Sequence, residues 1–372
     1  MKYVWQYSNW PNLTWQSEKL LVLLGQSRYC QGRLLAKVRK LGVSFSRHAQ
    51  AEIMIEEAIK TSEIEGQKLL RDSVRSSVAR HLGLPAAGLP SSNRHIDGLI
   101  DVLLDATANY NKPLSPKRLK SWHAALFPTG FSGLHNIRAG KWRGPHPMQV
   151  VSGPVGREKV HFQAPPMDRI DKEMNHFFSW WEKSLRDIEG LLRAGIAHFR
   201  FVTIHPFEDG NGRLARALTD MALAQDEKLP VRFYSLSSRI MEERKDYYIV
   251  LEHCQKGSGD ITEWLLWFLG CFVRAVENSE KLISKVLAKA GFWERHAQTI
   301  VNERQRKVVN RLLDAGQGEF KGGLTTRKYV SMAKVSKATA YREISDLTNK
   351  KILEKTRGKG RNISYELVWH RQ

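Results

Sequence analysis

Apolar side chains recur every three or four positions through long stretches of this chain, a periodicity typical of helices buried along one face. Helices are predicted over residues 15–43, 46–62 and 213–225. Gly66, just after the second stretch, is a residue type that commonly ends a helix. The expected core positions of these helices are Leu20, Leu21, Leu24, Leu34, Leu35, Val38, Ala51, Met54, Ile55, Ala58, Ile59, Leu214, Ala217, Leu218, Met221 and Ala222.

Strand character appears in two places. Residues 149–152 and 159–162 are rich in β-branched positions and flank the turn-forming sequence Gly153-Pro154-Val155-Gly156-Arg157, which predicts a β-hairpin. Residues 352–354 and 362–368 have the same character on either side of a loop. The pattern by itself leaves open whether the first hairpin has a role or simply lies at the surface.

Composition limits the class of protein. With 372 residues and 42% hydrophobic content, the chain is expected to form two or three domains. Cys30, Cys254 and Cys271 lack the spacing of a metal or redox motif, which favours a reducing compartment. No signal peptide is evident in residues 1–15, and the longest apolar run, 264–273, is too short to cross a bilayer. A soluble, cytoplasmic protein without a membrane partner is expected.

Charge is the strongest departure from average composition. The formal net charge is +21, and residues 301–372 hold 17 Lys or Arg against 7 Asp or Glu. Helices are predicted there over 304–315, 325–332 and 336–350, the last capped by Ser336. Three helices followed by a basic hairpin resemble a winged helix-turn-helix, and the loop alternates Lys355, Arg357, Lys359 and Arg361. Residues 301–372 are therefore expected to bind DNA, although a protein-binding or dimerisation module is the alternative.

Residues 205–216, His-Pro-Phe-Glu-Asp-Gly-Asn-Gly-Arg-Leu-Ala-Arg, concentrate the candidate chemistry. His205 has the side chain whose pKa suits proton abstraction near neutral pH, and the Asp209 carboxylate suits a hard cation such as Mg²⁺. Glycine-rich backbone before a helix presents free N–H groups and a partial positive charge to an anion. The anion-binding candidates are Gly210, Asn211, Gly212, Arg213 and Arg216.

A second motif, Thr61-Ser62-Glu63-Ile64-Glu65-Gly66, lies at the end of the helix predicted over 46–62. A carboxylate at a helix C-terminus is disfavoured by the helix dipole unless a cation lies beside it. The six residues alone are equally consistent with a solvated helix end.

Together the two motifs resemble the Fic family of nucleotidyl transferases. Residues 205–216 match its HPFxDGNGRxxR signature and residues 61–66 match the (S/T)xxxE(G/N) motif of its inhibitory helix, although Ala215 stands where many relatives have glycine. The resemblance implies a mainly α fold, a Fic helical core with a β-hairpin flap over the active site. The expected parts are an N-terminal module (1–92) with an inhibitory helix (about 46–66), a catalytic domain (93–284), a helical connector (285–300) and a winged-helix domain (301–372).

The resemblance also implies an activity: transfer of AMP from ATP to a Ser, Thr or Tyr hydroxyl of a target protein. His205 would be the base, Asp209 would hold Mg²⁺, and the backbone of 210–212, the Asn211 side chain and Arg213 would stabilise phosphate charge. Arg216 would orient the γ-phosphate unless Glu65, in the inhibitory motif with Thr61 and Gly66, pairs with it. Tyr247 and Gln255 are expected to enclose adenine, with Tyr248 as the alternative core member of the tyrosine pair.

Two other functions remain open at this point. Glu65 could also position water for removal of AMP, or the chain could be a transcriptional regulator whose Fic fold only senses nucleotide. The target, the DNA sequence and the oligomeric state, including a homodimer, are not readable from the residues.

Overall fold

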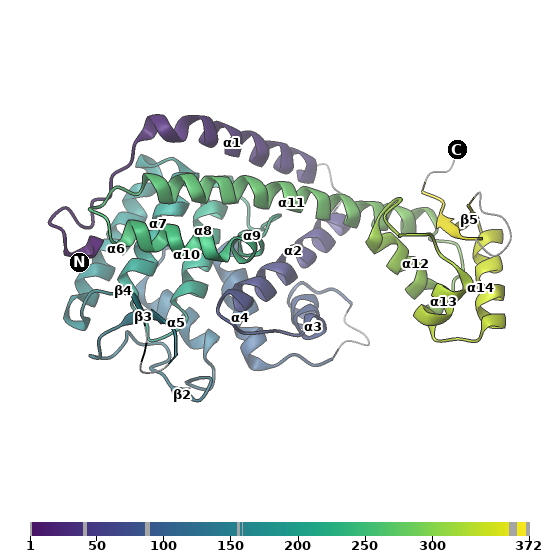
Figure 1. Cartoon of the computed structure of the whole chain (residues 1–372), viewed down its shortest axis with the longest axis horizontal. Coiled ribbons are helices and arrows are strands. Elements are labelled where there is room, and N and C mark those ends of the chain that lie inside the picture. The colour runs from purple at the N-terminus through teal and green to yellow at the C-terminus, as the bar shows by residue number, and fades with distance from the viewer. Residues whose placement is uncertain are drawn as a thin grey trace. The chain divides into compact units, whose positions relative to one another are not determined.

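The computed structural model describes residues 2–39, 43–85, 90–154, 157, 159–356 and 363–369. The chain divides into two compact units, Met1–Ser279 and Glu280–Gln372, and Figure 1 labels their α-helices and most of their strands. Helices dominate both units, and the strands form three separate two-stranded antiparallel sheets within the described residues. The expected mainly α architecture is confirmed.

The first unit contains the 3₁₀ helices η1 (Val4–Gln6) and η2 (Met167–Arg169), and the α-helices α1 (Ser17–Arg39), α2 (Val43–Ile64), α3 (Arg71–His81), α4 (Arg94–Ala108), α5 (Pro116–Leu126), α6 (Ile170–Asp187), α7 (Gly190–Ile204), α8 (Asn211–Glu227), α9 (Leu236–Glu242) and α10 (Arg244–Gln255). Its strands are β1 (Phe131–Ser132), β2 (His135–Asn136), β3 (Gln149–Ser152) and β4 (Lys159–Gln163). α11 (Thr262–Arg295) begins in this unit and continues beyond its boundary. The second unit adds α12 (Glu303–Ala315), α13 (Thr326–Ala333), α14 (Lys337–Asn349), β5 (Leu353–Lys355) and β6 (Tyr365–Leu367).

α7 and α8 form the centre of the first unit. Every residue of α7 from Leu191 to Ile204 is buried, so this helix is enclosed by protein on all sides. α8 packs along it, and α6 and α4 cover the pair, while α2 lies against α9 and α4. The short loop between α7 and α8, residues 205–210, is therefore held rigidly from both ends.

The buried face of α1 is narrower than the pattern predicts. Leu20 and Leu34 are buried as expected, but Leu21 is 64% exposed. Polar Ser27 and Gln31 occupy the buried face instead, and Gln31 donates a hydrogen bond to the buried Glu227 at 2.8 Å. Consecutive helical residues point about 100° apart, so Leu21 lies on the solvent side once Leu20 faces inward.

α11 extends into the region expected to connect the domains. The apolar run 264–273 forms a buried helix as predicted, and the helix continues without a break from Thr262 to Arg295. Residues 285–295 of the expected helical connector (285–300) are thus the end of α11, and the expected domain boundaries stay predictions. In the part of the chain that the structure describes, no helix is long and apolar enough to cross a membrane.

The predicted hairpin over 149–162 is confirmed. β3 and β4 pair antiparallel, with Gln149 opposite Gln163 and an irregularity between Val150 and Val151. Its turn residues Val155 and Gly156 lie outside the described residues.

The N-terminal segment supports this hairpin from one side. Trp5 and Phe162 are buried against each other, and Tyr3 meets the Phe162 ring edge-on at 5.2 Å. The indole Nε1 of Trp5 donates a hydrogen bond to the Gln163 carbonyl at 2.7 Å. These contacts tie residues at the start of the chain to strand β4.

Replacing Trp5 with alanine is expected to loosen β3 and β4. The change removes a buried aromatic ring and leaves the Gln163 carbonyl without its indole partner, so amide hydrogen exchange in residues 149–163 should accelerate by roughly tenfold or more. Hydrogen exchange followed by mass spectrometry measures this directly. Trp5→Phe, which keeps a ring but not the N–H, should give an intermediate rate, and unchanged exchange in Trp5→Ala would show that the segment does not support the hairpin.

The second unit has its own core. It is built from residues of α11 to α14, of both strands and of the segments just before α13 and β5: Phe292, Val308, Val309, Leu312, Leu313, Leu324, Tyr329, Ala340, Ile344, Leu347, Ile352, Leu353 and Leu367. The three predicted helices are confirmed to within two residues at each end, and Ser336 caps α14 as expected. Arg357, Lys359 and Arg361 lie outside the described residues.

Candidate active site

Two left-handed residues shape the loop between α7 and α8. His205 ends α7 with φ 52°, and Gly210 precedes α8 with φ 79°. A Cβ at Gly210 would come within 2.8 Å of the Phe127 ring, so glycine is required there both for its backbone and for its size. The Asn211 carboxamide closes the loop by bonding to both the N–H (3.0 Å) and the carbonyl (2.8 Å) of Phe207.

The Asn211 side chain makes its hydrogen bonds within the loop. It is buried, and its Oδ1 and Nδ2 each bond to Phe207, so these contacts hold the loop, and the expected contact with phosphate stays a prediction.

His205 has the geometry of a general base. Its Nδ1 lies 3.2 Å from the Val202 carbonyl, which requires a proton on Nδ1 and leaves Nε2 as the free acceptor of the neutral ring. Burial lowers the pKa of His205 and is the largest effect. The hydrogen bond to Val202 opposes it, the nearby Arg143 guanidinium lowers the pKa further, and the charges of Glu65 and Asp209 raise it slightly. The ring is therefore neutral near pH 7 and able to accept a proton.

Asp209 is the candidate metal ligand. Its side chain is 37% exposed, and Ser132 Oγ donates a hydrogen bond to its Oδ2. One accessible carboxylate beside an anion site fits Mg²⁺, which proteins commonly bind through one or two carboxylates together with substrate phosphates.

Arg213 provides a buried cation with unused donors. Its residue is only 6% exposed, yet Nε and Nη2 have no hydrogen-bond partner, and Nη1 has only a long contact of 3.4 Å with Gln67. The guanidinium lies over the Phe127 ring at 4.7 Å, and the Asp209 carboxylate is 3.8 Å from Nη2. Buried donors without partners are rare in native proteins, so this group is suited to an anionic ligand at the start of α8.

Arg216 is already bound by the protein. Its Nε donates to Thr61 Oγ1 at 2.6 Å, and Nη2 donates to the Thr61 carbonyl at 3.0 Å and to Glu65 Oε1 at 2.7 Å. The same Glu65 oxygen would be 2.2 Å from a Cβ built on Gly212. The carboxylate of Glu65 therefore lies directly against the first turn of α8, where an anion is favoured.

The end of α2 places Glu65 at this position. Gly66 has φ 78°, its N–H donates to the Glu63 carbonyl at 3.0 Å, and Gln67 N–H donates to the Ser62 carbonyl at 2.9 Å. These paired bonds form a Schellman motif, with glycine at the left-handed position. The prediction that Gly66 ends the helix is confirmed.

The loop between α7 and α8 is also held by hydrogen bonds of His123, Arg143 and Glu208, for which the sequence pattern predicts no role. His123 Nδ1 accepts from Gly140 N–H at 2.8 Å, so its Nε2 donates to the Asp209 carbonyl at 3.1 Å. Arg143 Nε donates to the His205 carbonyl at 2.9 Å, and Glu208 accepts from the Arg138 N–H at 2.8 Å. No local pattern identifies these residues, since their partners lie 62 to 86 positions away.

The tyrosine pair is oriented opposite to the expectation. Tyr247 is buried, and its hydroxyl lies 3.0 Å from His198 Nε2. Tyr248 is 38% exposed, and its pKa is raised by burial and then by the charge of Glu65. Gln255 is buried and donates to Thr203 Oγ1 at 3.2 Å. Both tyrosines interact electrostatically with the Glu65–Arg216 pair, and Tyr248 is the one whose ring is exposed.

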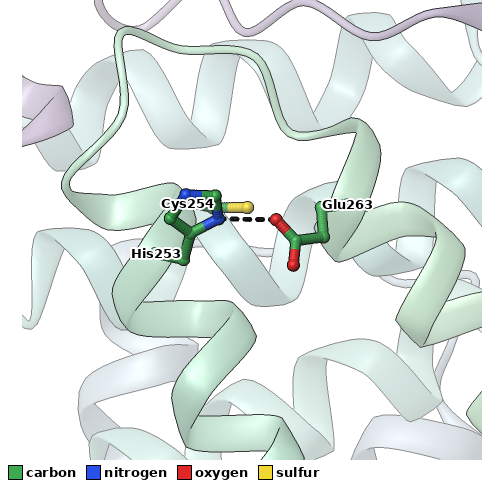
Figure 2. Close-up of side chains that lie close together, drawn as sticks. All are labelled: His253, Cys254 and Glu263. Carbon is green, nitrogen blue, oxygen red and sulfur yellow. Dashed lines mark hydrogen bonds and ion pairs between the residues drawn. The ribbon is translucent and has the colours of Figure 1, made fainter.

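His253, Cys254 and Glu263 form a separate cluster between α10 and α11 (Figure 2). His253 Nδ1 and Glu263 Oε2 are 2.5 Å apart, both side chains are largely exposed, and the Cys254 sulfur lies beside them. Burial raises the pKa of the Cys254 thiol to about 11. The sulfur is thus protonated at neutral pH, whereas metals bind the thiolate, so the cluster is accounted for as an exposed ion pair.

Comparison with known proteins identifies the domain in which this loop lies. Residues 113–223 match the Fic/DOC family, and residues 3–84 match a domain of unknown function, DUF4172. The chain therefore contains a Fic/DOC domain, and the loop described above lies within it.

Individual relatives add to this result. The chain is 24% identical over 237 residues to the "Protein adenylyltransferase Fic" of Nematostella vectensis, covering 62% of this chain and 50% of that protein. It is 37% identical over 82 residues to a "Uridine 5'-monophosphate transferase" of Xanthomonas campestris pv. campestris (strain 8004), covering 20% of this chain and 15% of that protein. The crystal structure of a Fic family protein from Desulfovibrio desulfuricans G20 has the same fold, with a TM-score of 0.53 at 20% identity over 95% of this chain and 97% of that one.

The chain is therefore homologous to Fic protein adenylyltransferases. It spans about half the length, or less, of the first curated relatives that it matches.

Proposed function

We propose that this protein transfers AMP from ATP to a hydroxyl of a protein side chain, and that Glu65 restrains the reaction. The observation that carries the proposal is that one short segment contains both a neutral imidazole with a free Nε2, at His205, and a buried guanidinium with unused donors, at Arg213 in the first turn of α8. A base and a preformed anion site next to each other are what phosphoryl transfer needs, because its catalysis depends on position and charge stabilisation.

In the proposed reaction, His205 Nε2 takes the proton of the target hydroxyl while that oxygen forms a bond to the α-phosphorus of ATP. The bond between the α-phosphorus and the bridging oxygen breaks, and its electron pair leaves with pyrophosphate. Arg213 and the backbone N–H groups of the first turn of α8 stabilise the charge on the phosphate oxygens. Mg²⁺ held by Asp209 would neutralise further phosphate charge.

Arg216 and Tyr248 have supporting roles in the proposal. Arg216 would bind the γ-phosphate through the donors that Thr61 and Glu65 now occupy. Tyr248 is proposed to contact the base in place of Tyr247, since its ring is the accessible one of the pair. The hairpin β3–β4 is proposed as the flap that binds the target by strand addition.

The test is incubation of the full chain and of Glu65→Gly with Mg²⁺ and ATP labelled at the α- or γ-phosphate. Only the α-label should remain on protein after denaturation, because pyrophosphate carries the γ-phosphate away. Labelled UTP in parallel tests the other nucleotide, which the name of the Xanthomonas relative suggests. Nucleotide binding without transfer of any label would instead favour a sensor of nucleotide, and loss of AMP from a labelled target would favour the reverse activity.

A further inference from the structure

The second unit contains two helices joined by a tight turn. α13 and α14 are separated by Lys334, Val335 and Ser336, and Lys334 takes the left-handed conformation with φ 54°. Ser336 Oγ accepts the Thr339 N–H at 3.2 Å and so caps α14. A short turn followed by a surface helix is the arrangement of a helix-turn-helix.

The strands of this unit pair in an order that is characteristic of one DNA-binding fold. Leu324, between α12 and α13, exchanges two backbone hydrogen bonds of 2.8 Å with Tyr365 of β6, and β6 pairs antiparallel with β5. Three strand positions therefore lie in the order Leu324, β6, β5. Helix, strand, two helices and a two-stranded hairpin is the chain order of a winged helix-turn-helix.

The acidic residues of α14 are held by partners within the unit. Glu343 is buried and accepts hydrogen bonds from the Tyr329 hydroxyl at 2.7 Å and from Arg304 Nη2 at 2.6 Å. Asp346 accepts from Gln305 Nε2 at 2.7 Å. Both carboxylates are thus neutralised or hydrogen-bonded against the other elements of the unit.

The basic and polar residues at the start of α14 face outward. Ser336, Lys337 and Arg342 are exposed, and Tyr341 is 65% exposed. Among the described residues, neither Lys337 nor Arg342 has an ion-pair partner. The N-terminal half of α14 therefore presents two free cations, a hydroxyl and a phenol, and Asp346, one turn beyond Arg342, is paired with Lys350.

We propose that the second unit is a winged helix-turn-helix and that this face of α14 binds duplex DNA. Duplex DNA carries about one negative charge per 1.7 Å of its axis, which complements a face with two unpaired cations, beside which the carboxylate of Asp346 is neutralised by Lys350. Lys337 and Arg342 would contact phosphates, and Ser336 and Tyr341 would reach phosphate or base edges. This binding is separate from AMP transfer and does not depend on it.

The test is a titration of a fluorescent mixed-sequence duplex with the full chain over a series of salt concentrations. The double variant Lys337→Ala/Arg342→Ala is expected to bind roughly 10- to 100-fold more weakly, and the slope of log affinity against log salt should fall by about 2. The matched control, Lys307→Ala/Arg311→Ala, removes the same charge from exposed positions of α12 and should change the affinity by less than about threefold.

Each other outcome would overturn the proposal. Equal losses in the two double variants would mean that charge alone attracts the duplex, and no binding at low salt would remove DNA as the partner. Displacement of the duplex by poly-glutamate as effective as by unlabelled DNA would indicate an acidic protein partner. If Lys337→Ala/Arg342→Ala lowers the unfolding temperature, Lys337→Gln/Arg342→Gln, which keeps the side-chain length, replaces it.

Discussion

Replacing His205 is expected to reduce AMP transfer by roughly 10²- to 10⁴-fold, the usual contribution of a general base. Binding of ATP should change by less than about tenfold, because the imidazole acts on the incoming hydroxyl and not on the nucleotide. Transfer is measured with α-labelled ATP in the Glu65→Gly background, and binding is measured by calorimetry.

The left-handed backbone of His205 makes the choice of variant important. Alanine is strained at φ 52°, whereas asparagine adopts this conformation more readily. Both His205→Ala and His205→Asn are therefore expected to lose transfer, and only His205→Ala should also lose stability. Retention of transfer in His205→Asn would reject His205 as the base.

The loss of activity at low pH is expected to reflect protonation of His205. The base must be neutral, and burial lowers its pKa below the ordinary value of 6.5. Activity lost by protonation should therefore decline only below pH 6.5, in a profile measured with Glu65→Gly. A decline that begins well above this pH would assign the acid limb to another group.

Replacing Glu65 with glycine is expected to raise AMP transfer roughly 10- to 100-fold. The substitution removes a charge-assisted hydrogen bond of 2.7 Å to Arg216, and such bonds are worth about 1.5–3 kcal/mol. It also clears the carboxylate from the first turn of α8, where the phosphates are proposed to bind. The initial rate of labelling reports the change.

Two controls separate release of Arg216 from simple loosening of α2. Glu63→Gly introduces the same glycine two positions away, where the carboxylate pairs with Lys60 at 2.7 Å and not with Arg216, so it should leave transfer near the wild-type rate. Glu65→Gly combined with Arg216→Ala should lose the gain, because the freed arginine is the proposed agent. An unchanged rate in Glu65→Gly, with the fold intact by circular dichroism, would falsify the inhibitory role.

The features that the sequence determined by itself are local. Gly66 and Gln67 end α2 through bonds to the Glu63 and Ser62 carbonyls, and Ser336 caps α14 through Thr339. Both depend on backbone geometry within five residues, so residue type and spacing suffice to predict them. The turn at Gly210 that begins α8 is local in the same way, because glycine there takes the left-handed conformation immediately before the helix.

Only the tertiary structure decided which distant residues contact the loop and which side chains of a helix face the core. The expected phosphate ligand Asn211 uses its carboxamide within the loop, and His123 and Arg143 hold that loop from distant positions. Tyr247 and Tyr248 differ in orientation by one helical step, so the packing of α10 against α7 and its His198 determines which ring is buried. Adjacent helical residues are alike in local propensity, and only long-range packing distinguishes the one that faces the core from the one that is exposed.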